Sequence, residues 1–203
     1  MLWYIPNILT FSRLVLTVIF LVMILCTPSS NAESRTQFLD VAFVIFVTAG
    51  ITDLVDGPIA RRLNVTSKFG RMIDPLADKI LVCGTFVCFA IIGEPKLFGF
   101  STTTLAIIHW AIAAILIARE AYVTTLRHIA EARGVDFAAT MSGKIKMCAQ
   151  TLAIGTVVVK MAHVQTAAWG YWFTTATFAV MLAVTVVSGI WATQRPSWKQ
   201  ATV

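Results

Sequence analysis

Four aspartates lie within 26 residues of one another, in a chain that has only ten acidic residues in total. They form two pairs. Asp53 and Asp56 are three residues apart and Asp74 and Asp78 are four apart, so each pair would share one face of a helix. Long apolar runs flank the cluster on both sides. Because an ionised carboxylate in or near hydrocarbon is costly, acids in such a setting usually have a function.

The positions of glycine and proline predict how the two pairs come together. We expect a helix that ends near Gly57–Pro58, a connection of about a dozen polar residues, and a second helix that begins near Ile73 with Pro75 in its first turn. Two antiparallel helices joined in this way would bring all four carboxylates to one membrane surface. Asp53 and Asp78 would lie one helical turn deeper than the other two.

The chemistry that suits such a cluster is metal binding. Four carboxylates held close together repel one another unless a cation lies among them, and hard oxygen ligands suit Mg²⁺ or Mn²⁺. Gly57 and Ala60 place no bulky side chain beside the acids, which leaves room for a ligand. Arg61 adds a fixed positive charge whose planar fork suits a phosphate.

Composition predicts an all-α, polytopic membrane protein. The chain is 58% hydrophobic and 13% charged, with a mean hydropathy of +0.80. Apolar runs of about 20 residues, long enough to cross a bilayer, recur along it. We expect a single domain over residues 1–203, with six transmembrane helices and a short N-terminal interfacial segment. The expected spans are residues 7–26, 38–57, 73–92, 102–126, 142–163 and 169–193. No basic tract with interleaved aromatic residues is present, which argues against nucleic-acid binding.

An even number of spans places both termini on one side of the membrane, and the basic residues indicate which side. The side of the termini would hold Arg61, Arg62, Lys68, Arg71, Arg127, Arg133, Lys144, Lys146, Arg195 and Lys199. The other side would hold Arg35, Lys96 and Lys160. Because basic residues are enriched in cytoplasmic loops, we expect cytoplasmic termini and an aspartate cluster that faces the cytoplasm. The protein would then be a multi-pass protein of the cytoplasmic (inner) membrane.

Other polar residues lie in or beside apolar segments. Asn7, Thr10 and Arg13 recur every three residues and would form a polar face on the first span. Arg13 belongs either to a site or to a positively charged anchor at the cytoplasmic surface. His109 and His163 are expected near the opposite surface, as interfacial residues. The four cysteines form no C-x-x-C pair, so we expect small core residues rather than metal ligands or disulfides.

The pattern D-x2-D-G-x2-A-R-x8-G-x3-D-x3-D runs without a gap from Asp53 to Asp78, and it resembles the signature of the CDP-alcohol phosphotransferase family. The resemblance implies a membrane enzyme, expected as a homodimer, that uses one or two Mg²⁺ or Mn²⁺ ions. Such an enzyme transfers the phosphatidyl group of CDP-diacylglycerol to an alcohol and releases CMP. Asp78 would be the general base as well as a metal ligand. The further metal ligands would be Asp53, Asp56 and Asp74, and the nucleotide end of the lipid would meet Asp53, Gly57, Ala60, Arg61 and Gly70.

The second half of the chain suggests the acceptor. Segments 118–127 and 142–150 resemble those of the phosphatidylglycerophosphate synthase branch of this family. A dianionic acceptor such as glycerol 3-phosphate needs cations near the aspartates, on the cytoplasmic side. The residues predicted at the acceptor phosphate are Thr10, Arg119, Arg127, Lys144 and Lys146.

Alternative functions stay open. A cardiolipin synthase of the same family would use phosphatidylglycerol, a lipid monoanion that needs fewer cations, and phosphatidylserine and phosphatidylinositol-phosphate synthases are further options. From a different class, a cation transporter could use an intramembrane carboxylate site. Transporters often show paired broken helices in two related halves, whereas here the aspartates cluster in one half only.

Overall fold

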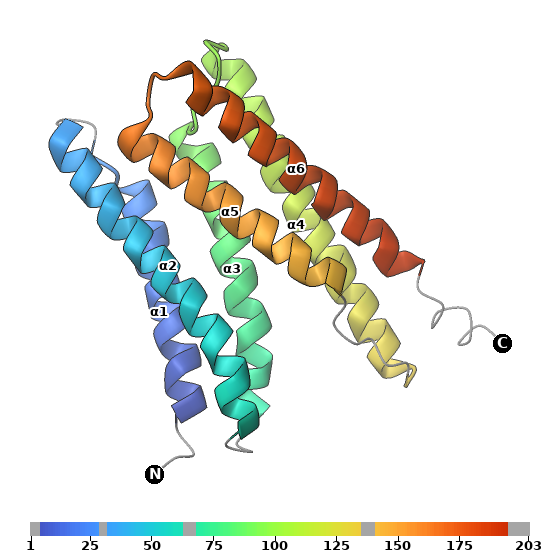
Figure 1. Ribbon diagram of the computed structural model, residues 1–203. Helices are drawn as coiled ribbons and strands as arrows, with labels where there is room; N and C mark the ends of the chain where they lie inside the picture. Colours follow the sequence, from blue (N-terminus) through green and yellow to red (C-terminus); the bar gives the residue numbers. More distant parts are fainter. Residues whose placement is uncertain (1–4, 29–31, 63–67, 135–140, 195–203) are drawn as a thin grey trace.

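Six helices that run alternately up and down make up the fold (Figure 1). The computed structural model describes the backbone of residues 5–28, 32–62, 68–134 and 141–194, and the side chains of residues 10–28, 32–52, 76–134 and 143–194. The helices are α1 (Ile5–Leu25), α2 (Ala32–Arg62), α3 (Lys68–Ile92), α4 (Thr102–Ala132), α5 (Met141–His163) and α6 (Ala168–Thr193). No strand occurs within the described backbone, so the all-α prediction is confirmed.

Among the residues whose side chains are described, four helices are long and apolar enough to cross a membrane. They cover residues 32–52, 102–132, 143–163 and 168–193, and a shorter apolar stretch covers Thr10–Leu25 in α1. Large apolar side chains such as Val44, Ile107, Leu152 and Val180 point outward with more than half of their surface exposed. In water such a surface would be unfavourable, whereas lipid covers it without cost. The chain is therefore a helical membrane protein.

The boundaries between α2 and α3 differ from the prediction. α2 does not end near Gly57–Pro58 but continues through both residues to Arg62, and α3 begins at Lys68, five residues earlier than expected. Pro75 consequently lies beyond the first turn of α3. An interior proline removes one intrahelical hydrogen bond. The hydrogen bonds of the turns before and after it remain, and an established helix propagates cooperatively. The connection is thus the five residues 63–67, and not about a dozen.

The loop before α2 is also shorter than expected, because α2 begins at Ala32 rather than near Phe38. Glu33 lies in the first turn of α2, where a carboxylate interacts favourably with the helix dipole. The last three helices match their predicted positions closely. α4 continues past its expected span, to Ala132, and the chain turns at Gly134, whose φ of +69° suits glycine.

The core draws buried apolar residues from all six helices, including Ile112, Ala113 and Leu116 of α4. Phe20 of α1 and Phe46 of α2 have ring centroids 5.2 Å apart, and Phe86 of α3 and Phe178 of α6 have centroids 5.9 Å apart. α5 contributes the most continuous buried stripe, since residues three and four apart share one helix face. Its buried apolar residues are Ala153, Ile154, Val157, Val158 and Met161. This packing fixes the helix segments that carry the polar residues described below.

At the end of the bundle remote from the aspartates, the structure corrects the predicted place of His109. Its side chain is 3% exposed, so it is a core residue and not an interfacial one, because the loop after α3 folds over it. His163 is exposed, as expected. Lys160 is buried as well, and its Nζ donates to the Lys96 carbonyl oxygen at 2.8 Å and lies 4.6 Å from the centroid of the Tyr171 ring.

The cysteines are free thiols, as predicted. Cys88 is buried and Cys83 is half-buried, which fits small core residues. Cys26 and Cys148 are exposed, so the prediction that all four lie in the core is wrong for these two. Both lie on or beside apolar helices that face outward, where lipid takes the place of a protein core.

Candidate active site

The two aspartate pairs lie in helix segments that adjoin one short connection. Asp53 and Asp56 lie in the last three turns of α2, and Asp74 and Asp78 lie in the first three turns of α3. Only five residues connect these antiparallel helices, which brings the two segments to the same end of the bundle (Figure 1). Apart from that of Asp78, the aspartate side chains lie outside the described residues, so the metal cluster stays a prediction. The side chains of Arg61 and Ala60 and the surroundings of Gly57 and Gly70 also lie outside them.

Asp78 forms an ion pair with Arg13 of α1. The Arg13 Nη2 donates to the Asp78 Oδ1 at 2.7 Å. The Arg13 side chain is 1% exposed, whereas that of Asp78 is 35% exposed and so can also meet a ligand. Thr10 is buried one turn before Arg13, on the same helix face. Arg13 is therefore not a surface anchor, because a buried guanidinium needs a carboxylate partner and Asp78 supplies it.

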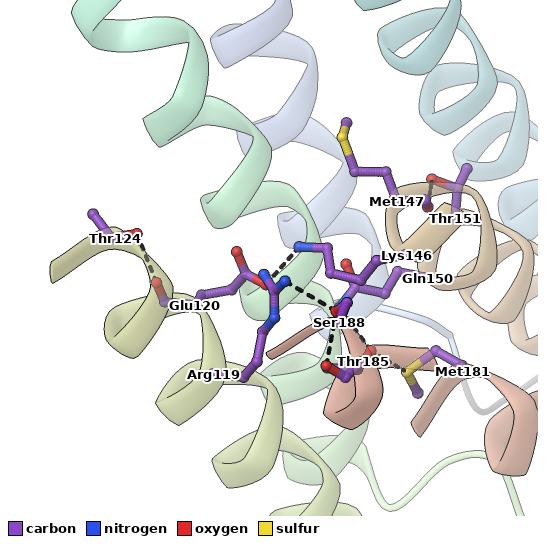
Figure 2. Close-up of polar contacts among 10 residues, drawn as sticks. All are labelled: Arg119, Glu120, Thr124, Lys146, Met147, Gln150, Thr151, Met181, Thr185 and Ser188. Atoms are coloured by element: carbon purple, nitrogen blue, oxygen red, sulfur yellow. Dashed lines mark hydrogen bonds and ion pairs between the residues drawn. The ribbon is translucent and has the colours of Figure 1, made fainter. Parts of the chain in front are cut away.

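A second polar cluster joins α4, α5 and α6 (Figure 2). The Glu120 Oε1 accepts from the Lys146 Nζ at 2.5 Å and from the Arg119 Nη1 at 3.0 Å. The Arg119 Nη2 donates to the Ser188 Oγ at 3.0 Å. Lys146 lies near the start of α5, where a lysine is expected at the surface. Its side chain is instead only 7% exposed. Its burial follows from Glu120, whose carboxylate balances the ammonium charge.

The prediction missed Glu120 and Ser188. Glu120 directly follows Arg119, and neighbours on a helix do not usually face each other, so the sequence gives no sign of their contact. The signal that identified the aspartates applies to Glu120 too, since it is an acid within an apolar helix. Ser188 carries no such signal, because a serine in a membrane helix commonly bonds its own backbone.

Further polar side chains extend this cluster along the contact of α5 and α6. Gln150, one turn after Lys146, is 1% exposed, and its Nε2 lies 3.5 Å from the Thr185 Oγ1. The Ser188 hydroxyl donates to the Thr185 carbonyl oxygen at 2.9 Å. Buried polar groups that satisfy one another in this way hold helices in a fixed relation. The cluster thus fixes α4, α5 and α6 around Arg119 and Lys146.

One groove of about 1320 Å³ connects the two polar clusters. It is lined by Arg13 and Asp78 from the first cluster and by Arg119, Glu120 and Lys146 from the second. Two exposed cations, Arg127 and Lys144, also line it. The structure therefore brings five predicted site residues to one groove, namely Asp78, Arg119, Arg127, Lys144 and Lys146. Thr10 is buried near Arg13 and is not part of the lining.

Much of the remaining lining is apolar. It includes Phe43, Phe46 and Val47 of α2 and Leu152 and Val159 of α5. A site with charged groups at one part and hydrocarbon walls along the rest suits an amphipathic ligand with a charged head. The charged part holds a carboxylate that could accept a proton and cations that could hold phosphate oxygens.

Comparison with known proteins identifies the family. The family model for CDP-alcohol phosphatidyltransferase matches residues 3–193. A CDP-diacylglycerol–glycerol-3-phosphate 3-phosphatidyltransferase of Bacillus subtilis is 31% identical over 201 residues, which are 96% of this chain and 95% of that protein. A probable phosphatidylglycerophosphate synthase of Mycobacterium tuberculosis is 30% identical over 187 residues, 91% of this chain and 77% of the relative. The chain belongs to the CDP-alcohol phosphatidyltransferase family.

Proposed function

We infer that this protein is an integral-membrane transferase of phospholipid biosynthesis. It moves the phosphatidyl group of CDP-diacylglycerol to glycerol 3-phosphate and forms phosphatidylglycerophosphate and CMP. The family match over almost the whole chain and the names of its relatives support this reaction. The observation that carries the proposal is the groove, because it holds Asp78, the basic residues and the apolar walls together. A lipid donor, a phosphate-bearing acceptor and a base are thereby accommodated in one site.

The four aspartates would hold the divalent cation that this chemistry needs. A set of carboxylate oxygens is the donor type that Mg²⁺ and Mn²⁺ prefer, and Asp78 is partly exposed toward the groove. We propose that Asp53, Asp56, Asp74 and Asp78 bind one or two ions. Held by these four carboxylates, such ions would supply positive charge to balance the diphosphate of CDP-diacylglycerol and the charge of the leaving CMP.

The chain's own residues would then orient the substrates and move one proton. Arg61 would hold the diphosphate, and Gly57, Ala60 and Gly70 would leave room for the nucleotide. Asp78 would accept the proton of the acceptor hydroxyl as that oxygen attacks the lipid-side phosphorus and the bond to CMP breaks.

The basic residues of the groove would bind the acceptor phosphate. Arg119 and Lys146 are fixed inside the second polar cluster, and Arg127 and Lys144 are exposed at the groove. A phosphate dianion gains charge-assisted hydrogen bonds from such residues. Thr10, although buried, remains assigned to the acceptor site through its position one turn from Arg13.

We propose that all six helices cross the membrane and that the groove's charged part faces the cytoplasm. The start of α1, the end of α6 and the helix segments that carry the aspartates lie at one end of the arrangement (Figure 1). Arg127 and Arg133 near the end of α4 and Lys144 near the start of α5 support a cytoplasmic orientation of that end, because basic residues are enriched on the cytoplasmic side. The protein would then lie in the cytoplasmic (inner) membrane. We also propose a homodimer, on the basis of family membership. A monomeric mass in mild detergent together with full activity would contradict the dimer.

A comparison of acceptors tests the function. Purified full-length protein receives CDP-diacylglycerol in detergent micelles with Mg²⁺ or Mn²⁺, and CMP release is measured with each candidate alcohol. We expect release with glycerol 3-phosphate and little release with glycerol, serine or phosphatidylglycerol. Glycerol is the matched control, since it differs from the acceptor by the phosphate alone. Equal release with phosphatidylglycerol would favour the cardiolipin synthase instead.

A further inference from the structure

The Arg119 guanidinium is held on two sides by buried neighbours. Its Nη1 donates to the Glu120 Oε1 and its Nη2 donates to the Ser188 Oγ, each at 3.0 Å (Figure 2). The Nε is buried and has no hydrogen-bond partner among the described atoms. A planar guanidinium bonded through both terminal nitrogens has its plane fixed. Arg119 also lines the groove.

Ser188 is built to accept from Arg119. It is 4% exposed, and its own hydroxyl hydrogen is used at 2.9 Å on the Thr185 carbonyl oxygen. The oxygen lone pairs are therefore left for the guanidinium. A Cβ built at the neighbouring Gly189 would lie 3.4 Å from the Arg119 Cγ, which places α6 within van der Waals distance of the Arg119 stem. The last helix thus lies directly against the stem and the head of Arg119.

Glu120 couples the same guanidinium to the second buried cation. One oxygen, Oε1, accepts from Arg119 and from Lys146, so both positive charges stay close to one carboxylate. Without that carboxylate two buried cations would repel each other and lose their charge balance. The hydrogen bond to Ser188 orients the Arg119 guanidinium. The Glu120 carboxylate balances the positive charge of Arg119.

We propose that Ser188 of α6 is a positioning residue for the acceptor phosphate, which acts through Arg119. This inference rests on the proposed function, in which Arg119 binds the phosphate of glycerol 3-phosphate. The last helix carries no motif of the family pattern described above, yet it supplies the contact that orients a cation from α4. Ser188 lines the groove but is only 4% exposed, and its hydroxyl is engaged by the Thr185 carbonyl oxygen and by Arg119. Its removal is therefore expected to act through Arg119, weakening acceptor binding and leaving donor binding unchanged.

The test compares Ser188→Ala, Ser188→Thr and a control on the same helix. Thr177→Val removes a hydroxyl that donates to the Phe173 carbonyl oxygen at 2.7 Å and does not line the groove. For each variant of the full-length protein, KM is measured for glycerol 3-phosphate and for CDP-diacylglycerol. Ser188→Ala raises the acceptor KM about 3- to 10-fold, the range expected for one lost hydrogen bond. The donor KM stays within twofold, Ser188→Thr restores most of the acceptor KM, and Thr177→Val matches wild type.

A double-variant cycle with Arg119→Ala decides whether Ser188 acts through Arg119. In the Arg119→Ala background, Ser188→Ala changes the acceptor KM no further, because the group that it orients is gone. If Ser188→Ala raised the acceptor KM in the Arg119→Ala background as much as it does in wild type, the inference would be overturned. A normal acceptor KM for Ser188→Ala, with a raised one for Arg119→Ala, would overturn the inference and leave the proposed function intact. A normal acceptor KM for Arg119→Ala would instead refute this residue's part in the proposed acceptor site, and the inference with it.

Discussion

Arg13 and Asp78 are 65 residues apart in the chain, and an ion pair of 2.7 Å joins them across α1 and α3. The arginine is almost completely buried, whereas the aspartate is one-third exposed and lines the groove. The first helix thus balances charge beside an aspartate assigned to metal binding and proton transfer. This relation explains why a buried arginine is tolerated in an otherwise apolar helix.

Replacing Arg13 by methionine tests that charge balance. The change keeps most of the apolar stem and leaves Asp78 without this cation, which we expect to cost about 1–3 kcal/mol of stability. A divalent ion at the aspartates would then take over the balance. Mg²⁺ should therefore raise the thermal unfolding midpoint of Arg13→Met more than that of wild type. Arg35→Met is the matched control, because Arg35 pairs with Glu94 at 3.3 Å at the other end of the bundle. Equal Mg²⁺ shifts in all three proteins would show that Arg13 does not serve the cluster.

Removing divalent cations should abolish activity. The four predicted metal ligands are carboxylates, which repel one another when close together unless a cation lies among them, and CDP-diacylglycerol adds the negative charge of its diphosphate. We expect no CMP release in EDTA, and recovery when Mg²⁺ or Mn²⁺ is added in excess. Full turnover by protein from which all divalent metal has been removed would refute the metal assignment.

Asp78→Asn should separate chemistry from donor binding. Asparagine is nearly isosteric but cannot take a proton from the acceptor hydroxyl, and loss of one positioned base typically costs about 10²–10⁴-fold in rate. Binding of CDP-diacylglycerol, measured by equilibrium titration, should persist. Asp40→Asn is the control, since Asp40 is exposed and lies 2.7 Å from the His163 Nε2 in the remote part of the bundle. More than a tenth of the wild-type rate in Asp78→Asn would mean that another group is the base.

Glu120→Gln should destabilise the protein more than a paired replacement does. It leaves the buried Lys146 and Arg119 without their carboxylate, and breaking a buried ion pair in this way costs about 3–5 kcal/mol. The double variant Glu120→Leu/Lys146→Met removes both charges of the tighter pair, and we expect its unfolding midpoint to lie closer to wild type. If the double variant unfolded at a lower temperature than Glu120→Gln, charge balance would not be the role of Glu120.

Local features of the sequence predicted the class of the protein and part of its site. The four aspartates of the cluster lie within a stretch of 26 residues, at spacings of three and four within each pair. Their pairing on helix faces therefore follows from helix geometry alone. The apolar length of α4, α5 and α6 likewise located these helices closely. The predictions of the end of α2 and of the start of α3 were wrong because a proline signals a probable helix boundary. In the structure α2 continues through Pro58 to Arg62.

Contacts between distant residues could not be predicted in this way. Arg119 and Ser188 are 69 residues apart, and nothing in either segment indicates that α6 packs on α4 at that point. The burial of Lys146 has the same origin, since it depends on Glu120 of another helix. His109 appeared interfacial from its place near a helix start, but the fold of the adjacent loop decides its burial.

The most direct test of the proposed reaction follows a label from acceptor to lipid. Purified protein receives CDP-diacylglycerol, Mg²⁺ and glycerol 3-phosphate labelled in its glycerol carbon, and both CMP and label in the extracted lipid are measured over time. We predict that the two rise together in equal amounts and that the labelled lipid carries the acceptor phosphate. CMP release without label in the lipid, or label transfer that does not need CDP-diacylglycerol, would contradict the proposed function.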